Sequence, residues 1–101
     1  MMGIATEKIS GGKLLRIKTL YTIHKIVDVK ITGDFFMHPE EGVFALEKRV
    51  IGIPTNTEKE EITRILDGAV QERSMELVGI STEDIARVLK KSLNLENMVT
   101  D

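Results

Sequence analysis

Hydrophobic and polar residues alternate along two segments in the first third of the chain, as they do in β-strands with one packed and one polar face. The first is Lys13–Tyr21, in which Leu15 and Ile17 alternate with basic residues. The second is Ile26–Thr32. About five residues separate the segments, which permits an antiparallel hairpin but is too short for a parallel crossover. The predicted packed face of the second segment is Val27, Val29 and Ile31, and its polar face is Asp28, Lys30 and Thr32.

Residues 1–10 show no clear period. They are compatible with a first edge strand or with a loose arm, and residues 1–7 in particular are open to either interpretation. Gly11 and Gly12 follow and indicate a turn before the first predicted strand. The predicted sheet therefore has two or three strands.

Further along the chain the spacing of apolar residues becomes helical. A first helix is predicted from Pro39, which suits the first helical position, to about Ile51. Glu40 and Glu41 would lie at its electropositive N-terminus, and Gly52 is expected to end it in a left-handed conformation. Its apolar stripe is Val43, Leu46 and Val50.

Two more helices are predicted from capping-box signatures, Thr57 with Glu60 and Ser81 with Asp84. The third helix is expected to run to about Leu93, and residues 95–101 are expected to fray. The stripes of the two helices are Ile62, Ile65, Leu66, Ala69 and Val70, and then Ile85, Val88, Leu89 and Leu93. Strands followed by helices predict one α+β domain over residues 1–101, a two-layer fold in which about three helices cover one face of a small antiparallel sheet.

Composition excludes several functions. Charged residues make up 30% of the chain and hydrophobic residues 42%, and the net charge of -2 argues against binding to nucleic acid. The absence of cysteine excludes disulfides, thiolate metal sites and cysteine nucleophiles. No apolar run approaches the ~20 residues that cross a bilayer, and no secretory signal is evident. We therefore expect a cytoplasmic protein without membrane contact.

Catalytic motifs are not evident in the sequence. Gly11-Gly12-Lys13 resembles part of a phosphate loop, but that motif needs a glycine where Glu7 stands and a Ser or Thr where Leu14 stands. We therefore interpret the glycines as a turn and Lys13 as a surface cation. His24 and His38 lie in different predicted loops, so no metal site is predicted. The residues alone indicate an α+β binding module.

The segment after the second strand, Gly33–Pro39, is the strongest functional candidate. Gly33 falls where the strand must turn, which suggests a special φ or a close contact, and Asp34 can accept backbone hydrogen bonds. Phe35 and Phe36 are expected to point different ways, one into the core and one outward. The alternative is that both lie in the core and the loop is only a connector. The candidate partner-contacting residues are Gly33, Asp34, Phe35, Phe36 and His38.

This segment carries a family resemblance. Gly11–Leu14 followed by Ile26–Phe36 looks like the C-terminal domain of lipoate-protein ligases. Pro39-Glu40-Glu41 and Val78–Ile85 are similar to the starts of later helices in that family, so the likeness covers roughly residues 8–93. The chain departs from the family at Tyr21–Lys25, which lacks the usual glycine turn, and at Gly42, inside the first predicted helix.

The resemblance implies a fold akin to sulfur-transfer and iron–sulfur scaffold proteins, whose cysteine-dependent functions this chain cannot perform. In the family, a large part converts ATP and lipoate to lipoyl-adenylate and passes the acyl group to a lysine of an acceptor protein. Some archaeal-type ligases are split, and the length and Met1 of this chain fit their small subunit. We therefore expect a non-catalytic accessory subunit, needed for lipoate activation, in a heterodimer whose large chain holds ATP, Mg and lipoate. This chain alone is expected to bind no cofactor, and it would act on lipoyl-acceptor proteins only indirectly.

Three other functions were considered. One is a homo-oligomeric adaptor or regulator that shares the fold, which composition does not exclude. Another is an independent ligase, which the absence of a recognisable nucleotide or acyl site disfavours. The third is a carrier domain that receives lipoate on Lys25, which is disfavoured because such carriers are nearly all-β.

Overall fold

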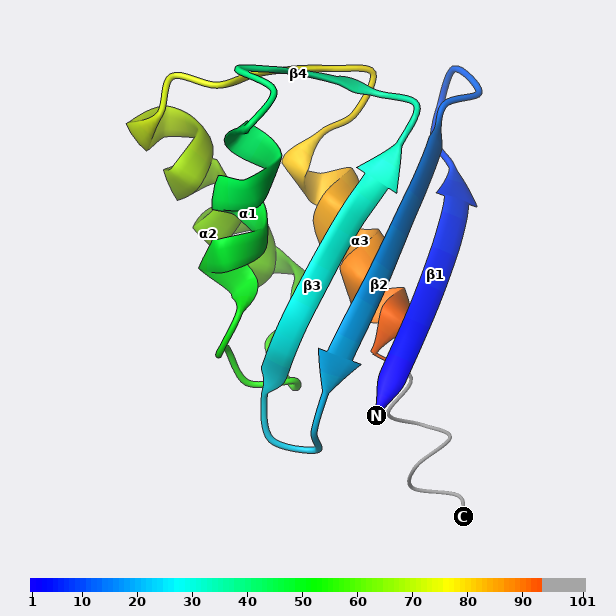
Figure 1. The fold of residues 1–101 in the computed structure, drawn as a ribbon, viewed down its shortest axis with the longest axis vertical. Coiled ribbons are helices and arrows are strands. Elements are labelled where there is room, and N and C mark those ends of the chain that lie inside the picture. The colour runs from blue at the N-terminus through cyan, green and yellow to red at the C-terminus, as the bar shows by residue number, and fades with distance from the viewer. Residues whose placement is uncertain (94–101) are drawn as a thin grey trace.

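A three-stranded antiparallel sheet forms one layer of the molecule (Figure 1). The computed structural model describes residues 1–93, so the predicted fraying of residues 95–101 lies outside the described residues. The strands are β1 (Met2–Lys8), β2 (Leu14–Tyr21) and β3 (Ile26–Gly33), in the spatial order β1-β2-β3. The segment left open in the sequence is thus an edge strand.

Residues 1–93 contain three helices, α1 (Gly42–Val50), α2 (Lys59–Glu72) and α3 (Thr82–Ser92). They lie on one side of the sheet: α1 packs on β3, α3 packs on β1 and β2, and α2 packs against α1 and α3 (Figure 1). The predicted α+β class, with helices on one face of an antiparallel sheet, is confirmed. None of these helices has the length and apolar character needed to cross a bilayer.

A second, two-stranded sheet was not predicted. It consists of β4 (Phe36–His38) and β5 (Glu76–Val78), which pair antiparallel at one end of the molecule (Figure 1). Each strand has three residues, too few for an alternating pattern to be recognised.

The core lies between the main sheet and the helices. In β2, Leu15, Ile17, Thr19 and Tyr21 are buried and the residues that alternate with them are exposed, which confirms the alternation predicted for Leu15 and Ile17. The helical stripes confirm the predicted packing faces. Buried helical residues include Leu46, Val50, Ile62, Leu66, Ala69, Ile85, Val88 and Leu89.

The predicted packed face of β3 was wrong at one position. Leu20 pairs with Asp28 and Tyr21 pairs with Ile26, so Val27 is an extra residue that forms a β-bulge. The bulge reverses the alternation, and Ile26 is buried while Val27 is 41% exposed. The remaining predicted inward residues, Val29 and Ile31, are buried.

The start of α1 also differs from the prediction. The backbone N–H of Gly42 donates to the carbonyl of Pro39 (2.9 Å), and that of Phe44 donates to the carbonyl of Glu41 (3.1 Å). These tight turns precede the helix, so Pro39 and Glu40 lie outside it and its first turn contains no acidic residue. At its other end α1 stops at Val50, because Ile51 is already extended. Gly52 has the predicted positive φ, of 90°, but its N–H bonds to Ile26 of β3 and not to the helix.

The two predicted capping boxes have different outcomes. At α3, Ser81 Oγ accepts from the N–H of Asp84 and the N–H of Ser81 donates to Asp84 Oδ2, both at 3.0 Å. At α2 the prediction was wrong, because the residue before the helix is Glu58 and its side chain forms no cap. The hydroxyl of Thr57 instead donates to the carbonyl of Pro54 (2.6 Å). The Thr57 hydroxyl therefore bonds within a local turn and does not form the cap on α2 that the sequence signature predicts.

The C-terminal end of α3 lies directly on the sheet. Thr19 Oγ1, buried on β2, donates to Ser92 Oγ at 3.1 Å. A Cβ atom at Gly3 of β1 would lie 1.7 Å from the carbonyl oxygen of Ser92. Only a glycine allows this close approach of helix and strand.

An ionic network joins β1 to α3. The carboxylate of Glu7 accepts from Lys91 Nζ (2.6 Å) and from Arg87 Nε (2.9 Å), and these bonds lower the pKa of Glu7. Arg87 also donates to Asp84 (2.8 Å). Burial alone would raise the pKa of Asp84, but the bonds from Arg87 and Ser81 outweigh it and the pKa is lowered. The pKa of Arg87 is raised by its two carboxylate partners.

The outer edge of β3 is partly covered. The backbone N–H of Ile31 donates to Glu47 Oε2 of α1 at 2.7 Å. Near the start of the strand, the N–H of Ile26 donates to the carbonyl of Ile53 (3.0 Å), and that of Gly52 donates to the carbonyl of Ile26 (2.7 Å). Backbone groups that an edge strand would otherwise expose are thus already bonded.

Candidate partner-binding site at one end of the sheet

Gly33 ends β3 where two backbones come close together. A Cβ atom at this position would lie 2.2 Å from the carbonyl oxygen of Leu14 and 3.0 Å from the ring of Phe35. The next residue, Asp34, donates its N–H to the same carbonyl (2.9 Å). The side chain of Asp34 is exposed. The close contact predicted for Gly33 is therefore present, and it fixes where the following loop leaves the sheet.

The two phenylalanines point in different directions, as expected. Phe35 is half-buried and packs against the hydrophobic core. Phe36 is 70% exposed on β4. A large aromatic side chain held in solvent by a regular strand is typical of a contact surface rather than of a simple connector.

Pairing of β4 with β5 holds the outward aromatic side chain in place. Phe36 is opposite Val78, and His38 is opposite Glu76. Between them, Met37 is buried, so β4 has one anchored residue flanked by two exposed ones. Val78 is 51% exposed and extends the apolar surface of Phe36.

A shallow groove of about 410 Å³ lies beside this pair of strands. Its walls come from the end of β3, from Phe35 and Phe36, from Glu40 in the turn before α1, and from Val43 in the first turn of α1. The groove is mainly apolar, and Glu40 contributes the carboxylate at its margin. Such a groove suits an apolar side chain of another molecule.

The predicted Gly11-Gly12-Lys13 turn lies at the same end of the molecule. Gly11 and Gly12 have φ values of 95° and 85°, and a Cβ atom at either would meet open space, so backbone conformation alone requires glycine there. The stem of Lys13 lies against Gly79, where an added Cβ atom would be 3.4 Å from Lys13 Cγ. The structure thus brings together the two groups of residues singled out from the sequence.

The arrangement is suited to contact with another molecule. Within residues 1–93, no three His, Asp or Glu side chains are grouped so that they could hold a metal ion. The groups with resolved pKa shifts, Glu7, Asp84 and Arg87, are neutralised by one another between β1 and α3. The exposed groups at the loop end include apolar side chains, the imidazole of His38, the ammonium group of Lys13, and the carboxylates of Asp34, Glu40 and Glu76.

Sequence reasoning missed the part of the site that comes from β5 and α1. Val78 was noted only in the resemblance, and Glu40 was assigned to a helix N-terminus. No local pattern identifies Val78 as part of this surface, because strand pairing across about forty intervening residues brings it to Phe36. Glu40 follows Phe36 closely in the chain, but its composition pattern was that of a helix start.

Comparison with known proteins gives one kind of match. Neither a protein-family model nor a curated protein matches the chain. Among solved structures, the chain is similar to one from an archaeal lipoylation system, described as a bipartite lipoate protein ligase and its E2 lipoyl domain from Thermoplasma acidophilum. The two share 28% identity with a TM-score of 0.73, and the alignment covers 88% of this chain and 94% of that chain.

Proposed function

We propose that this chain is the accessory subunit of a two-part lipoate-protein ligase, required by a separate catalytic chain for ATP-dependent activation of lipoate. The observation that carries the proposal is the likeness over nearly the whole chain to a component of an archaeal bipartite ligase system. The Gly33–Phe36 segment supports it independently, because it resembles the ligase C-terminal domain and forms an exposed contact surface. The same likeness favours this function over a homo-oligomeric adaptor.

The similar system also contains a lipoyl domain, which suggests a competing assignment. The layered fold argues against it. Helices α1, α2 and α3 cover one face of the sheet, whereas lipoyl carriers are nearly all-β. Lys25 is the lysine near the β2–β3 hairpin. The N–H of the next residue, Ile26, donates to the carbonyl of Ile53 in the segment after α1.

The contribution of this subunit is conformational. No catalytic motif is evident in its sequence, and we propose that it acts by favouring a state of the catalytic chain in which ATP and lipoate are aligned. A shift of that state from about 1:99 to 99:1 needs roughly 5.5 kcal/mol of differential binding. Phe36 and the adjoining groove provide the apolar contact that we assign to this role.

Two assays separate this role from acyl transfer. The first measures lipoate-dependent pyrophosphate release by the catalytic chain with and without this subunit. The second supplies preformed lipoyl-adenylate and measures transfer to the acceptor protein. We expect the subunit to be needed chiefly in the first assay, and full adenylation by the catalytic chain alone would exclude the proposed role.

Variants of the loop test which residues carry the effect. Phe36→Ala and Asp34→Ala should depress pyrophosphate release more than transfer. Ile23→Ala is the matched control, because Ile23 is also highly exposed (61%) but lies in the β2–β3 hairpin at the opposite end of the sheet (Figure 1). Equal activity of Phe36→Ala and Ile23→Ala, with both variants folded and bound, would contradict the assignment of the loop.

A further inference from the structure

The side of the main sheet that faces away from the helices is not covered by any element of residues 1–93 (Figure 1). We call it the open face. It presents the exposed alternate residues of the three strands, and four of them are apolar. The apolar members are Met2, Ile4, Leu14 and Leu20, with exposed fractions of 40–61%.

Cations are concentrated on the open face. Lys8, Arg16, Lys18 and Lys30 lie there with a single carboxylate, Asp28. The chain as a whole has a net charge of -2, so charge is segregated between the open face and the rest of the molecule. None of the four cations forms an ion pair with another residue of the described part of the chain.

Two of these cations oppose each other within the sheet. Lys18 and Lys30 are directly cross-strand partners in the β2–β3 ladder. Like charges in directly opposite positions destabilise a sheet, whereas an opposite-charge pair would stabilise it. The isolated subunit therefore carries two like charges at paired positions, and an anionic group nearby would reduce their repulsion.

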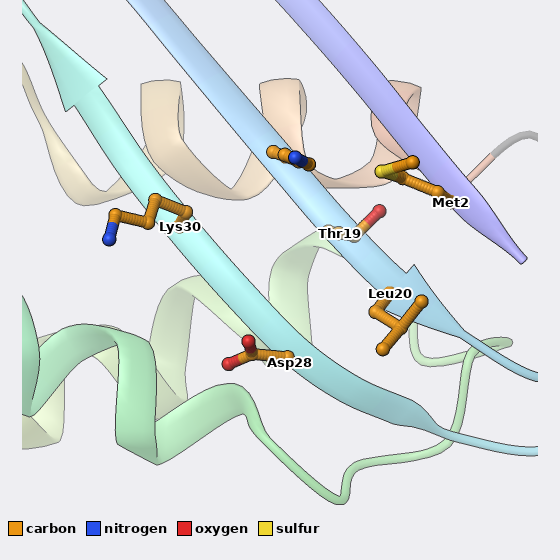
Figure 2. Close-up of a pocket in the computed structure, with 6 residues that line it drawn as sticks. Met2, Thr19, Leu20, Asp28 and Lys30 are labelled. Carbon is orange, nitrogen blue, oxygen red and sulfur yellow. The ribbon is translucent and has the colours of Figure 1, made fainter.

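A hollow of about 300 Å³ lies next to this pair (Figure 2). Figure 2 shows Met2, Leu20, Asp28 and Lys30 arranged around it on three neighbouring strands. It combines an apolar wall, the two cations Lys18 and Lys30, and a carboxylate in one depression. A surface that matched it would have to present apolar atoms, an acidic group and a hydrogen-bond donor together.

We infer that the open face is the docking surface for the catalytic chain, through an acidic and partly apolar region of that chain. This inference rests on the proposed function and adds the face by which the two subunits bind. The apolar residues Met2 and Leu20 and the acceptor Asp28 call for apolar atoms and a hydrogen-bond donor beside the acidic group, which the uniformly anionic phosphates of nucleic acid or of membrane headgroups do not supply. A second copy docked face to face would place lysines against lysines, so a different, acidic protein surface is the occupant that the charges favour.

The open face is continuous with the loop site. Thr32 is opposite Arg16 on the open face, and it also lines the groove beside Phe36. A partner seated over β2 and β3 therefore reaches the groove without a gap. Docking on the face positions the loop, and the loop acts on the catalytic chain.

Lys18→Glu tests this inference, because the substitution should weaken binding of the catalytic chain without lowering the stability of the isolated subunit. The substitution puts Glu opposite Lys30, so the thermal midpoint of the isolated subunit should stay the same or rise. Binding of the catalytic chain, measured by titration calorimetry, should weaken by about tenfold or more, and the wild-type affinity should fall with added salt. Lys30→Gln removes a positive charge without adding a negative one and should also weaken binding. Lys18→Arg keeps the positive charge and should retain binding.

The control is Lys48→Glu, which makes the same change in net charge on the exposed side of α1. Lys18→Glu and Lys48→Glu binding equally well would overturn the docking face while leaving the proposed function intact. Failure of the wild-type subunit to bind the catalytic chain would overturn both. Binding to vesicles of phosphatidylcholine and phosphatidylserine in equal parts, lost in Lys18→Glu while binding to the catalytic chain is unchanged, would assign the face to a membrane.

Discussion

Gly3 and Gly33 are required by tertiary contacts rather than by turns. Both lie within or at the end of a strand, and in each case a carbonyl oxygen of another segment occupies the space of a side chain. Gly11 and Gly12 differ, since their surroundings are open and their φ values alone favour glycine. Glycine is therefore needed for two different reasons in this domain, close backbone approach in the strands and a positive φ in the turn.

Gly33→Val is predicted to destabilise the protein by about 1–3 kcal/mol, because the new Cβ atom would displace the carbonyl of Leu14 from its present position. The free energy of unfolding, measured in urea, gives the effect directly. Thr32→Val serves as control, since Thr32 is exposed on the same strand and should change stability by less than about 0.5 kcal/mol. Equal stability of the two variants would contradict the close contact.

Local sequence indicated the role of Gly33 but not that of Gly3. Gly33 follows a clear strand and precedes a loop, so a special backbone feature is expected from its position. Gly3 contacts Ser92, which lies near the other end of the described chain, and nothing near Gly3 indicates that contact. Val27 was misplaced for a related reason, because Ile26 and Val27 are both apolar and either could have faced the core.

At the scale of elements, the capping box of α3 provides a stability prediction. Ser81→Ala removes the acceptor for the N–H of Asp84 and should cost about 1 kcal/mol. Thr57→Ala removes no helix cap, because its hydroxyl bonds to Pro54. Chemical unfolding of both variants should show the larger loss for Ser81→Ala, and the reverse order would mean that α2 is capped in solution.

The ionic link between β1 and α3 predicts a pH dependence. The pKa of Glu7 is lowered in the folded state by its bonds to Lys91 and Arg87, so its contribution is complete above the ordinary glutamate pKa and is lost as the pH falls through the lowered value. Glu7→Gln should therefore reduce the free energy of unfolding by roughly 0.5–1 kcal/mol at neutral pH.

Denaturant unfolding at neutral and acidic pH measures this difference. The stabilities of wild type and Glu7→Gln should converge only when the pH falls below the lowered folded-state pKa of Glu7, where the group is protonated in both the unfolded and the folded protein. A gap that stays constant across this range would show that Glu7 acts through packing and not through its charge.

The elements that were predicted are those with long periodic stripes. Apolar spacing in α2 and α3 extends over several turns, and alternation in β2 covers the whole strand. The strands β4 and β5 have too few residues for such a signal, and their pairing depends on the positions of α1 and α2. The start of α1 was misplaced because Pro39 and two glutamates form a preceding turn that has the composition of a helix start.

For the whole molecule, the proposed function predicts a change in thermal stability. A partner that binds only the folded form stabilises it by mass action, by about 2.7 kcal/mol at a hundredfold excess over Kd. The thermal midpoint of this subunit should therefore rise when the catalytic chain is added. Differential scanning calorimetry of the mixture and of the separate chains tests this, and superimposable curves at micromolar concentration would favour the adaptor alternative.

The candidate site was predicted in part at this scale. The Gly33–Phe36 segment and the Gly11–Lys13 turn were both recognised, but their proximity depends on the hairpin that places Leu14 beside Gly33. The open face was foreseen only as the polar side of each strand. Its excess of cations becomes visible when β1, β2 and β3 are set side by side, because each strand alone carries an ordinary mixture of residues.

The bond from the N–H of Ile31 to Glu47 also limits self-association. Amyloid-like growth by strand addition continues only if every newly added molecule presents another free edge. Here β3 has one N–H held by Glu47 and its start occupied by the Gly52–Thr55 segment. In the three-stranded sheet, that leaves the outer edge of β1 as the available template. If two copies paired through β1, the outer edge of β1 would be occupied in both molecules. Edge-to-edge growth of this sheet would therefore stop at a dimer.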